Sequence, residues 1–295
     1  MTEVPARLPF RWDLVTPDQL GSLLEGTAPP GLSFLPSLVE CAGKVVARSG
    51  GGELVFVGRS LDSMFDLLSG ALADADGAVR LSRLPFSFQR LARSPGRRAW
   101  RQRPLPTAER AQAHRVLAGL GLAPKSLARR AAPVVFTDVV SGGSTFGDLF
   151  AVLRAWSDQE HAQWDIIRRK LRFTGVTRRL KTSPNAFRWQ QHAPWTTELP
   201  ASSIVNVSLD GVTWSYLADH QAKLTRSFPP AQWLEEAQAP GRDDKTRQAL
   251  AEAVSLVSYG RSPQGRKALA RAMDGEPALA QPWLRSLIRH LSSGT

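Results

Sequence analysis

Twice along this sequence, a short apolar run leads through a turn of small or polar residues into a segment with helical spacing. The first unit has an apolar run at 53–57, a turn at 58–60 and an expected helix over 61–72. The second has a run at 133–140, a turn at 141–145 and an expected helix that reaches residue 156. Repeated strand–turn–helix units predict right-handed crossovers and a largely parallel sheet with helices on both faces. Ligands of such sheets bind at the carboxyl ends of the strands, where both turns would lie.

The rest of the chain extends this α/β pattern. Hydrophobic periodicity predicts further helices within 16–25, 32–48, 107–120, 158–171, 212–224, 244–259 and 265–273. Short β-prone runs predict strands at 78–82, 171–176 and 203–209. The proline-punctuated, arginine-rich stretch over 84–104 is expected to be a long loop, and such loops often act as lids.

These elements predict three sections. Residues 1–31 form a lead segment, and residues 32–228 form an α/β domain with a parallel-rich central sheet flanked by helices. Residues 229–295, which begin near Pro229-Pro230, form a helical C-terminal appendage.

Composition favours a soluble cytoplasmic protein. Of 295 residues, 42% are hydrophobic and 22% are charged, values that are ordinary for globular domains. No apolar run is long enough to cross a membrane, and the first residues lack the apolar core of a signal peptide. The single cysteine, Cys41, excludes an intramolecular disulfide framework and a cysteine-rich zinc site.

The formal net charge of +12 favours anionic ligands, polyphosphates included. Nucleic acid stays open as a partner, although charge alone does not select it over other anions. We expect no membrane partner, and we leave open whether the chain forms a homodimer.

The turn at 141–145 has the chemistry of a phosphate site. Its backbone N–H groups would lie unpaired at the start of a helix, where the helix dipole adds positive potential. The hydroxyls of Ser141, Ser144 and Thr145 add further hydrogen-bond donors. The turn therefore suits a phosphate monoester, and Asp138 just before it suits a sugar diol.

The order of residue types from Pro133 to Thr145 resembles the phosphoribosyl diphosphate (PRPP) motif of type I phosphoribosyltransferases. This resemblance implies that Asp138 is the catalytic residue that anchors the ribose hydroxyls. It also implies a 5′-phosphate loop of Ser141, Gly142, Gly143, Ser144 and Thr145. Thr137 replaces the first of the two acids of the family, and it could hydrogen-bond a ribose hydroxyl without bringing charge.

The first turn, Gly58-Arg59-Ser60, is similar in position to the pyrophosphate loop of the same family. The resemblance implies that its amides and the Arg59 guanidinium bind the leaving diphosphate. The arginine-rich stretch corresponds in position to a segment that closes over the active site in the family. Arg97 and Arg98 are accordingly expected at the diphosphate, and a solvated basic loop is the alternative.

Basic residues interleaved with aromatic ones between residues 168 and 195 resemble a platform for base stacking. Trp189 and Trp195 could sandwich the base of an acceptor. The alternative is that both rings are core anchors, which is the commoner role of tryptophan.

These features predict an enzyme that moves a 5-phosphoribosyl group from PRPP to a nitrogenous acceptor and releases diphosphate. Mg²⁺ is the expected cofactor, bound mainly through substrate oxygens and water, with no protein metal ligands assigned. The alternative is a non-catalytic phosphoribosyltransferase-like nucleotide sensor or nucleic-acid-binding regulator, which the missing first acid and the long C-terminal section favour. A hydrolase or phosphorylase that acts on a ribose 5-phosphate conjugate is a third hypothesis.

Overall fold

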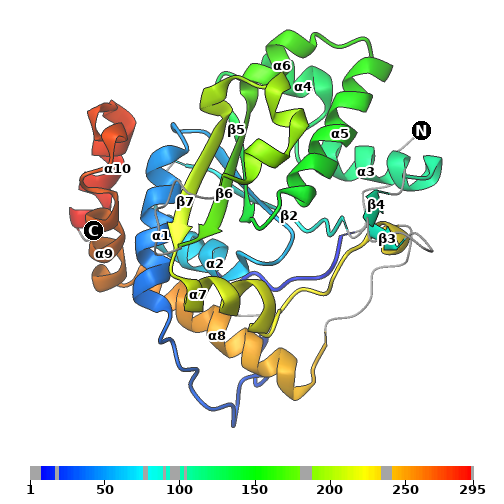
Figure 1. The fold of residues 1–295 in the computed structure, drawn as a ribbon. Coiled ribbons are helices and arrows are strands. Elements are labelled where there is room, and N and C mark those ends of the chain that lie inside the picture. Colours follow the sequence, from blue (N-terminus) through cyan, green and yellow to red (C-terminus); the bar gives the residue numbers. More distant parts are fainter. Residues whose placement is uncertain are drawn as a thin grey trace.

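The computed structural model describes residues 8–16, 20–75, 79–88, 91–93, 100–102, 105–179, 188–233 and 241–293. A five-stranded sheet lies at its centre, and all its strands run parallel in the order β2-β1-β5-β6-β7 (Figure 1). The strands are β1 (Glu53–Val57), β2 (Leu81–Leu84), β5 (Val134–Val139), β6 (Leu171–Arg178) and β7 (Ile204–Leu209). The expected α/β fold with a parallel central sheet is confirmed.

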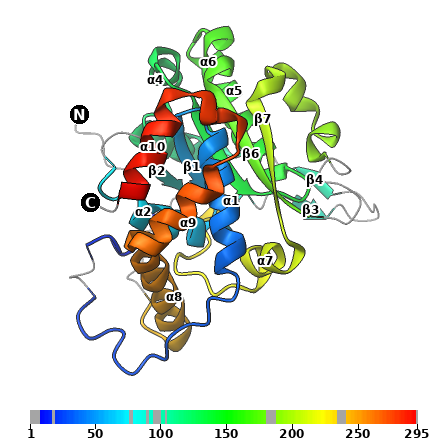
Figure 2. The same cartoon turned by 90° about the vertical axis from the view of Figure 1, so that its left-hand side faces the viewer.

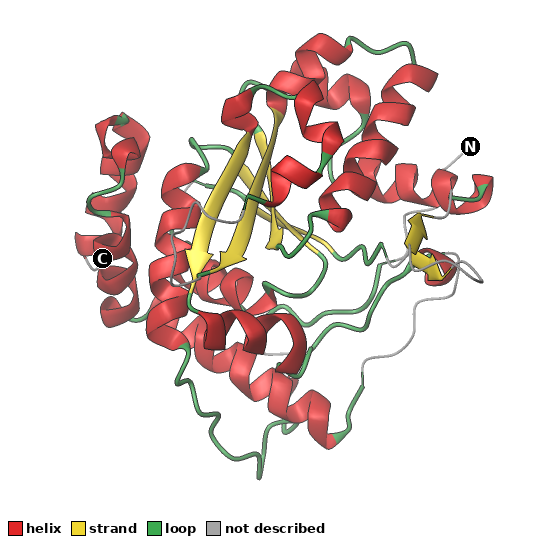
Figure 3. Cartoon of the chain, in the orientation of Figure 1, coloured by secondary structure: helices red, strands yellow, loops and turns green. Residues whose placement is uncertain are grey.

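Helices cover both faces of this sheet (Figure 3). One face carries α1 (Leu35–Arg48), α2 (Asp62–Ala71), α8 (Asp244–Arg261), α9 (Pro263–Met273) and α10 (Pro282–Ser293). The other face carries α3 (Thr107–Gly119), α4 (Pro124–Arg129), α5 (Ser144–Gln159) and α6 (Trp164–Lys170). We call the two hydrophobic clusters between sheet and helices the α1 core and the α5 core.

The apolar runs of the sequence are suited to strands of this sheet because their side chains are buried on both of its faces. Successive side chains of a strand point to opposite faces of the sheet. In β1, Leu54 and Phe56 lie in the α1 core, whereas Val55 and Val57 lie in the α5 core. A strand covered on both faces has no solvent side, so a continuous apolar run is the pattern it requires.

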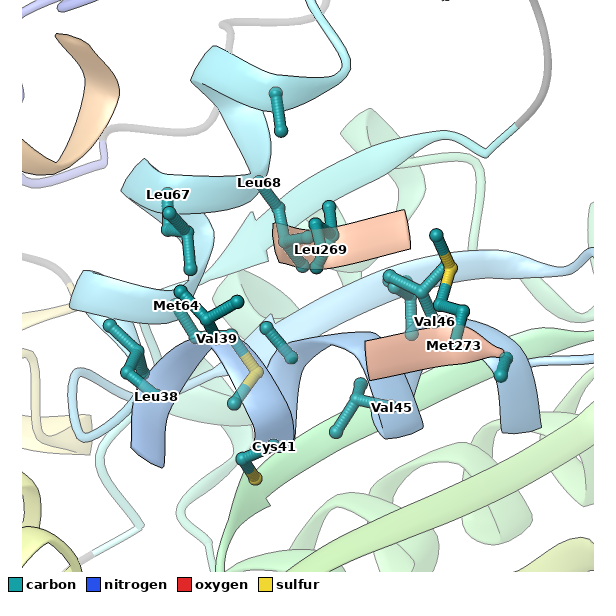
Figure 4. Close-up of a cluster of buried hydrophobic side chains, with 14 of the residues drawn as sticks. Leu38, Val39, Cys41, Val45, Val46, Met64, Leu67, Leu68, Leu269 and Met273 are labelled. Carbon is teal, nitrogen blue, oxygen red and sulfur yellow. The ribbon is translucent and has the colours of Figure 1, made fainter. Parts of the chain in front are cut away.

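The C-terminal helices belong to the α1 core. Helix α8 packs along α2, α9 packs against α1, and α10 packs against α9; in Figure 2 these three helices, coloured orange to red, face the viewer. Figure 4 shows Leu269 and Met273 of α9 among side chains of α1 and α2, including Val46 and Leu68. Residues expected to form an appendage thus contribute to the core beneath the sheet, and the expected boundary at residue 228 stays a prediction.

Helices α2 and α8 cross at close range through two glycines. A Cβ built on Gly260 would lie well under 3.0 Å from the Leu67 carbonyl oxygen, and one on Gly70 equally close to the Val257 carbonyl oxygen. Real Cβ atoms do not approach backbone oxygens so closely, so any larger residue must separate the helices.

We expect Gly260→Ala to lower the free energy of unfolding by up to about 2 kcal/mol, because overpacking usually costs about 1–3 kcal/mol. This loss outweighs the gain of about 1 kcal/mol in helix propensity. Urea denaturation measures the difference, with Gly119→Ala as the control because a Cβ there meets no atom within 4 Å. Equal stability of Gly260→Ala and the parent protein would contradict the close crossing.

Several expected elements differ from the structure. The stretch expected as a long loop contains β3 (Leu91–Arg93) and β4 (Trp100–Gln102), which pair antiparallel. The helix expected over 158–171 is instead the end of α5 followed by α6, with His161 between them in a left-handed conformation. Helices α4 and α10 were not expected from the periodicity.

The helix expected over 212–224 also ends early. Helix α7 (Gly211–Ser215) continues only as a π-helical turn over Tyr216–His220, and the chain then extends across the edge of the sheet. Within the described ranges, none of the helices is both long and apolar enough to cross a membrane.

Candidate functional site

The two turns singled out in the sequence lie side by side at the carboxyl edge of the sheet. Strands β1 and β5 are neighbours, paired from Glu53 opposite Val134 to Phe56 opposite Thr137. From β1 the chain continues to β2 on one side, and from β5 it continues to β6 on the other. The connections that leave β1 and β5 therefore run in opposite directions along the sheet. Open α/β sheets bind ligands at such a point, where the strand order reverses.

The bend after β1 turns through Gly58, whose φ of 71° is in the left-handed region. The Gly58 N–H donates to the Leu84 carbonyl at 2.8 Å, which ties the bend to β2. Arg59 is half-buried, and its Nη1 donates to the Thr225 carbonyl oxygen at 2.9 Å. Burial lowers the pKa of Arg59, and the nearby Asp62 opposes that shift.

The loop after β5 leads directly into α5. Ser141, Gly142 and Ser144 are exposed, Thr145 is half-buried, and Gly143 precedes the helix with a φ of 77°. No side chain caps this helix in the described part of the chain. Its first-turn amides therefore remain available to a ligand. The loop is open to solvent and has the donors of an anion site, as the sequence predicts.

Asp138 lies between these two turns, near the end of β5, and is 6% exposed. Its Oδ1 accepts a hydrogen bond of 2.8 Å from the Val139 amide, and its Oδ2 has no partner among the described residues. Burial raises the pKa of Asp138 to about 8, although the Val139 amide and Lys223 act in the opposite direction. A carboxyl group this strongly perturbed at a sheet edge is a candidate functional group.

Thr137 does not reach the site. Its side chain is fully buried, and its hydroxyl lies 3.5 Å from the Val135 carbonyl oxygen of the same strand. Thr137 and Asp138 are consecutive residues of a strand, so their side chains point to opposite faces of the sheet. This burial does not favour a contact between Thr137 and a ribose hydroxyl, and that expectation stays a prediction.

The structure places a further residue, Lys223, near Asp138, and the sequence pattern did not indicate it. Its Nζ donates to the Leu217 carbonyl oxygen at 2.6 Å and to Gln221 Oε1 at 2.7 Å. Burial lowers the pKa of Lys223 to about 8, while Asp62 acts to raise it. The position of Lys223 in the sequence could have indicated it, because residues 210–225 follow β7, whose carboxyl end lies at this edge of the sheet.

A buried network of ions supports the site from the side of α2. Asp62, the first residue of α2, accepts from Arg11 at 3.1 Å and from Arg83 at 2.7 Å. Burial alone would raise the pKa of Asp62, but these two guanidinium groups hold it below its usual range. Both guanidinium groups also donate to the Thr225 hydroxyl. The network thereby fixes the segment that carries Lys223.

Of the two tryptophans expected at an acceptor, one lies in the protein interior and the other is only partly buried. Trp189 is fully buried, and its Nε1 donates to Asn206 Oδ1 at 2.7 Å. Its ring packs against Gly143 and lies 5.7 Å from Phe146 between ring centroids. Trp195 is half-buried and packs near Phe150. Trp189 thus supports the 141–145 loop from within the α5 core, which favours the alternative of a core anchor, and the expected base sandwich stays a prediction.

The remaining expected ligands are not placed. Arg97 and Arg98 lie outside the described residues. The described residues contain no group of three or more histidine, cysteine, aspartate or glutamate side chains able to hold a metal ion. Searches of protein-family models, curated proteins and solved structures found no match.

Proposed function

We propose that this protein is a PRPP-dependent phosphoribosyltransferase whose site is the carboxyl edge between β1 and β5. The observation that carries the proposal is the convergence of three features there. An exposed loop, at a helix start that no described side chain caps, lies beside Asp138 and beside the bend that carries Arg59. One carboxyl oxygen of Asp138 has no partner among the described residues.

Each part of PRPP has a matching group in this arrangement. The 5′-phosphate takes the amides of the first turn of α5 and the hydroxyls of Ser141, Ser144 and Thr145. Asp138 Oδ2 accepts from a ribose hydroxyl. The diphosphate lies at the bend 58–60, where the Arg59 guanidinium supplies donors.

The chain contributes mainly positioning and charge compensation to the reaction. Asp138 orients the ribose, the loop fixes the 5′-phosphate, and Arg59 stabilises the charge that accumulates on the departing diphosphate. Mg²⁺ fits this site chiefly through substrate oxygens and water, because the described residues offer no ligand cluster. When bound, it would neutralise charge on the diphosphate.

A non-catalytic nucleotide sensor is the second candidate, and the burial of Thr137 favours it. With Thr137 inside the sheet, Asp138 is the one acid of the motif that can reach the ribose. Titration with PRPP and Mg²⁺, followed by a diphosphate-release assay with a panel of nucleobases, separates the candidates. Micromolar binding without turnover on any base would favour the sensor. Salt-dependent oligonucleotide binding without PRPP binding would favour a nucleic-acid regulator.

Thr145→Val tests the phosphate loop. We expect affinity for ribose 5-phosphate to fall about 10- to 100-fold, because a hydrogen bond to a charged group contributes about 1.5–3 kcal/mol. Isothermal titration calorimetry measures the change. Thr107→Val is the matched control, since Thr107 is an exposed threonine at the start of a different helix, α3. Equal affinity in Thr145→Val and the parent protein would reject the phosphate assignment.

A further inference from the structure

Two cations from distant parts of the sequence meet at the carboxyl edge. Arg59 Nη1 donates to the carbonyl oxygen of Thr225, two residues beyond Lys223. Burial and then the Arg59 charge lower the pKa of Lys223, whereas Asp62, Glu252 and Asp138 act to raise it. Within the described ranges, neither side chain has a carboxylate within 4.0 Å. Asp62 is engaged instead by Arg11 and Arg83.

Both cations keep hydrogen-bond donors for which the described residues supply no acceptor. A lysine ammonium has three N–H groups, and the described residues accept from Lys223 at two positions. A guanidinium has five, and the described residues accept from Arg59 at one. Two like charges, partly removed from water and incompletely hydrogen-bonded, are a site for an anion, because an anion supplies acceptors and removes their repulsion.

We propose that Lys223 is a second diphosphate ligand that acts together with Arg59. The identity of the anion rests on the function proposed above, whereas the anion site itself does not. A diphosphate offers enough oxygens to accept from the ammonium and the guanidinium at once, next to Asp138, where the ribose is expected.

The surroundings of Lys223 fix its position. The Gln221 amide nitrogen donates to Ser63 Oγ and Glu252 Oε1, which leaves its oxygen for Lys223. The Tyr216 hydroxyl donates to Glu252 Oε2 at 2.5 Å. At the end of the π-helical turn, the backbone N–H of Gln221 donates to the Tyr216 carbonyl oxygen. The next carbonyl oxygen, that of Leu217, accepts from Lys223 Nζ. These contacts hold the Lys223 ammonium in one position, whereas a lysine in free solvent would lack them.

Charge around Lys223 gives the site a pH dependence. The groups that face it are Asp62 on α2, Arg59 on the bend, Glu252 on α8 and Asp138 on β5. Because the pKa of Lys223 is about 8, the free protein loses this positive charge between pH 7 and 9. Affinity for an anion should fall over that range, and ionisation of Asp138 adds to the fall.

The test is calorimetric titration of the full chain with inorganic diphosphate at pH 7 and pH 9. We expect Lys223→Met to bind diphosphate about tenfold or more weakly at pH 7, the loss of one charge-assisted hydrogen bond. Lys125→Met, a change to an exposed lysine on α4, should leave affinity unchanged. Lys223→Arg keeps its charge at pH 9 and should lose less affinity between the two pH values than the parent protein does.

Equal diphosphate affinity in Lys223→Met and the parent protein overturns the proposal, as does an absence of diphosphate binding in the parent protein. If Lys223→Met is unfolded by circular dichroism, Lys223→Arg decides. The same loss between pH 7 and pH 9 as in the parent protein overturns the proposal, and a smaller loss supports it. Binding of diphosphate that depends on Lys223, without competition from PRPP, would keep the anion site and reject the transferase function.

Discussion

Asp138→Asn is expected to weaken PRPP binding or turnover by about 100-fold while making the folded protein more stable at alkaline pH. The first effect is expected at pH 9, where Asp138 is ionised because its pKa is about 8. It follows from the loss of a carboxylate acceptor for a ribose hydroxyl, a charge-assisted hydrogen bond of about 1.5–3 kcal/mol. Calorimetry with PRPP and a diphosphate-release assay measure it. Undiminished activity would reject the ribose role of Asp138.

The second effect follows from the burial of the same group. Burial raises the pKa of Asp138 from 3.8 to about 8, so the folded state holds its proton more tightly than the unfolded chain does. The stability that this proton contributes is present below pH 3.8 and is lost as the pH rises through about 8. Asparagine carries no such proton, so the parent protein should lose stability relative to the variant over this range, by at most on the order of 5 kcal/mol.

Urea denaturation at pH 5, 7 and 9 measures this difference. Asp274→Asn is the control, because Asp274 is exposed at the end of α9. A constant difference between Asp138→Asn and the parent protein at all three pH values would contradict a buried acid. If Asp138 lowers stability where it is charged and Asp138→Asn also weakens PRPP binding, the pair of results is typical of a functional residue rather than a structural one.

Gly143→Ala is expected to lower the free energy of unfolding by about 2–5 kcal/mol and to abolish ribose 5-phosphate binding. Two costs add here. The φ of 77° disfavours any residue with a Cβ, by about 1–2 kcal/mol. The new methyl group would also lie well under 3.0 Å from the Trp189 ring, which is fully buried and cannot easily move.

Gly142→Ala is the matched control for this prediction. Gly142 is the neighbouring residue, its φ is not in the left-handed region, and a Cβ on it would meet no atom within 4 Å. Urea denaturation and calorimetry should show little change for Gly142→Ala and a large loss for Gly143→Ala. Similar behaviour of the two variants would mean that Trp189 does not shape the loop.

The parts of the fold that can be predicted from the sequence are those that depend on neighbouring residues alone. The runs 53–57 and 133–140 have the continuous apolar character of strands buried on both faces, and the glycines after them fit the bends. Their placement at one sheet edge follows from parallel topology alone. The position of Asp138 next to the 141–145 loop at this edge could therefore be predicted from the sequence.

The rest of the site depends on contacts between distant segments. Nothing local in the sequence around Lys223 indicates that Gln221, Ser63 and Glu252 orient it, since these residues come from three different elements. Trp189 is buried because Asn206 on β7 accepts from its indole nitrogen and because Gly143 leaves room for the ring. Thr137 could have been recognised as buried from strand alternation, since its neighbours Val135 and Val139 lie on the α1 side.

The glycine-mediated contact between α2 and α8 has a consequence for how the protein matures. Asp62 begins α2 and organises the ions beside the ligand site, yet the position of α2 is set by a helix near the other end of the chain. During synthesis, the sheet and both turns leave the ribosome before α8 does. The proposed ligand site should therefore become competent only after α8 has emerged from the ribosome, and nascent chains that still hold α8 inside it should contain the loops without binding activity.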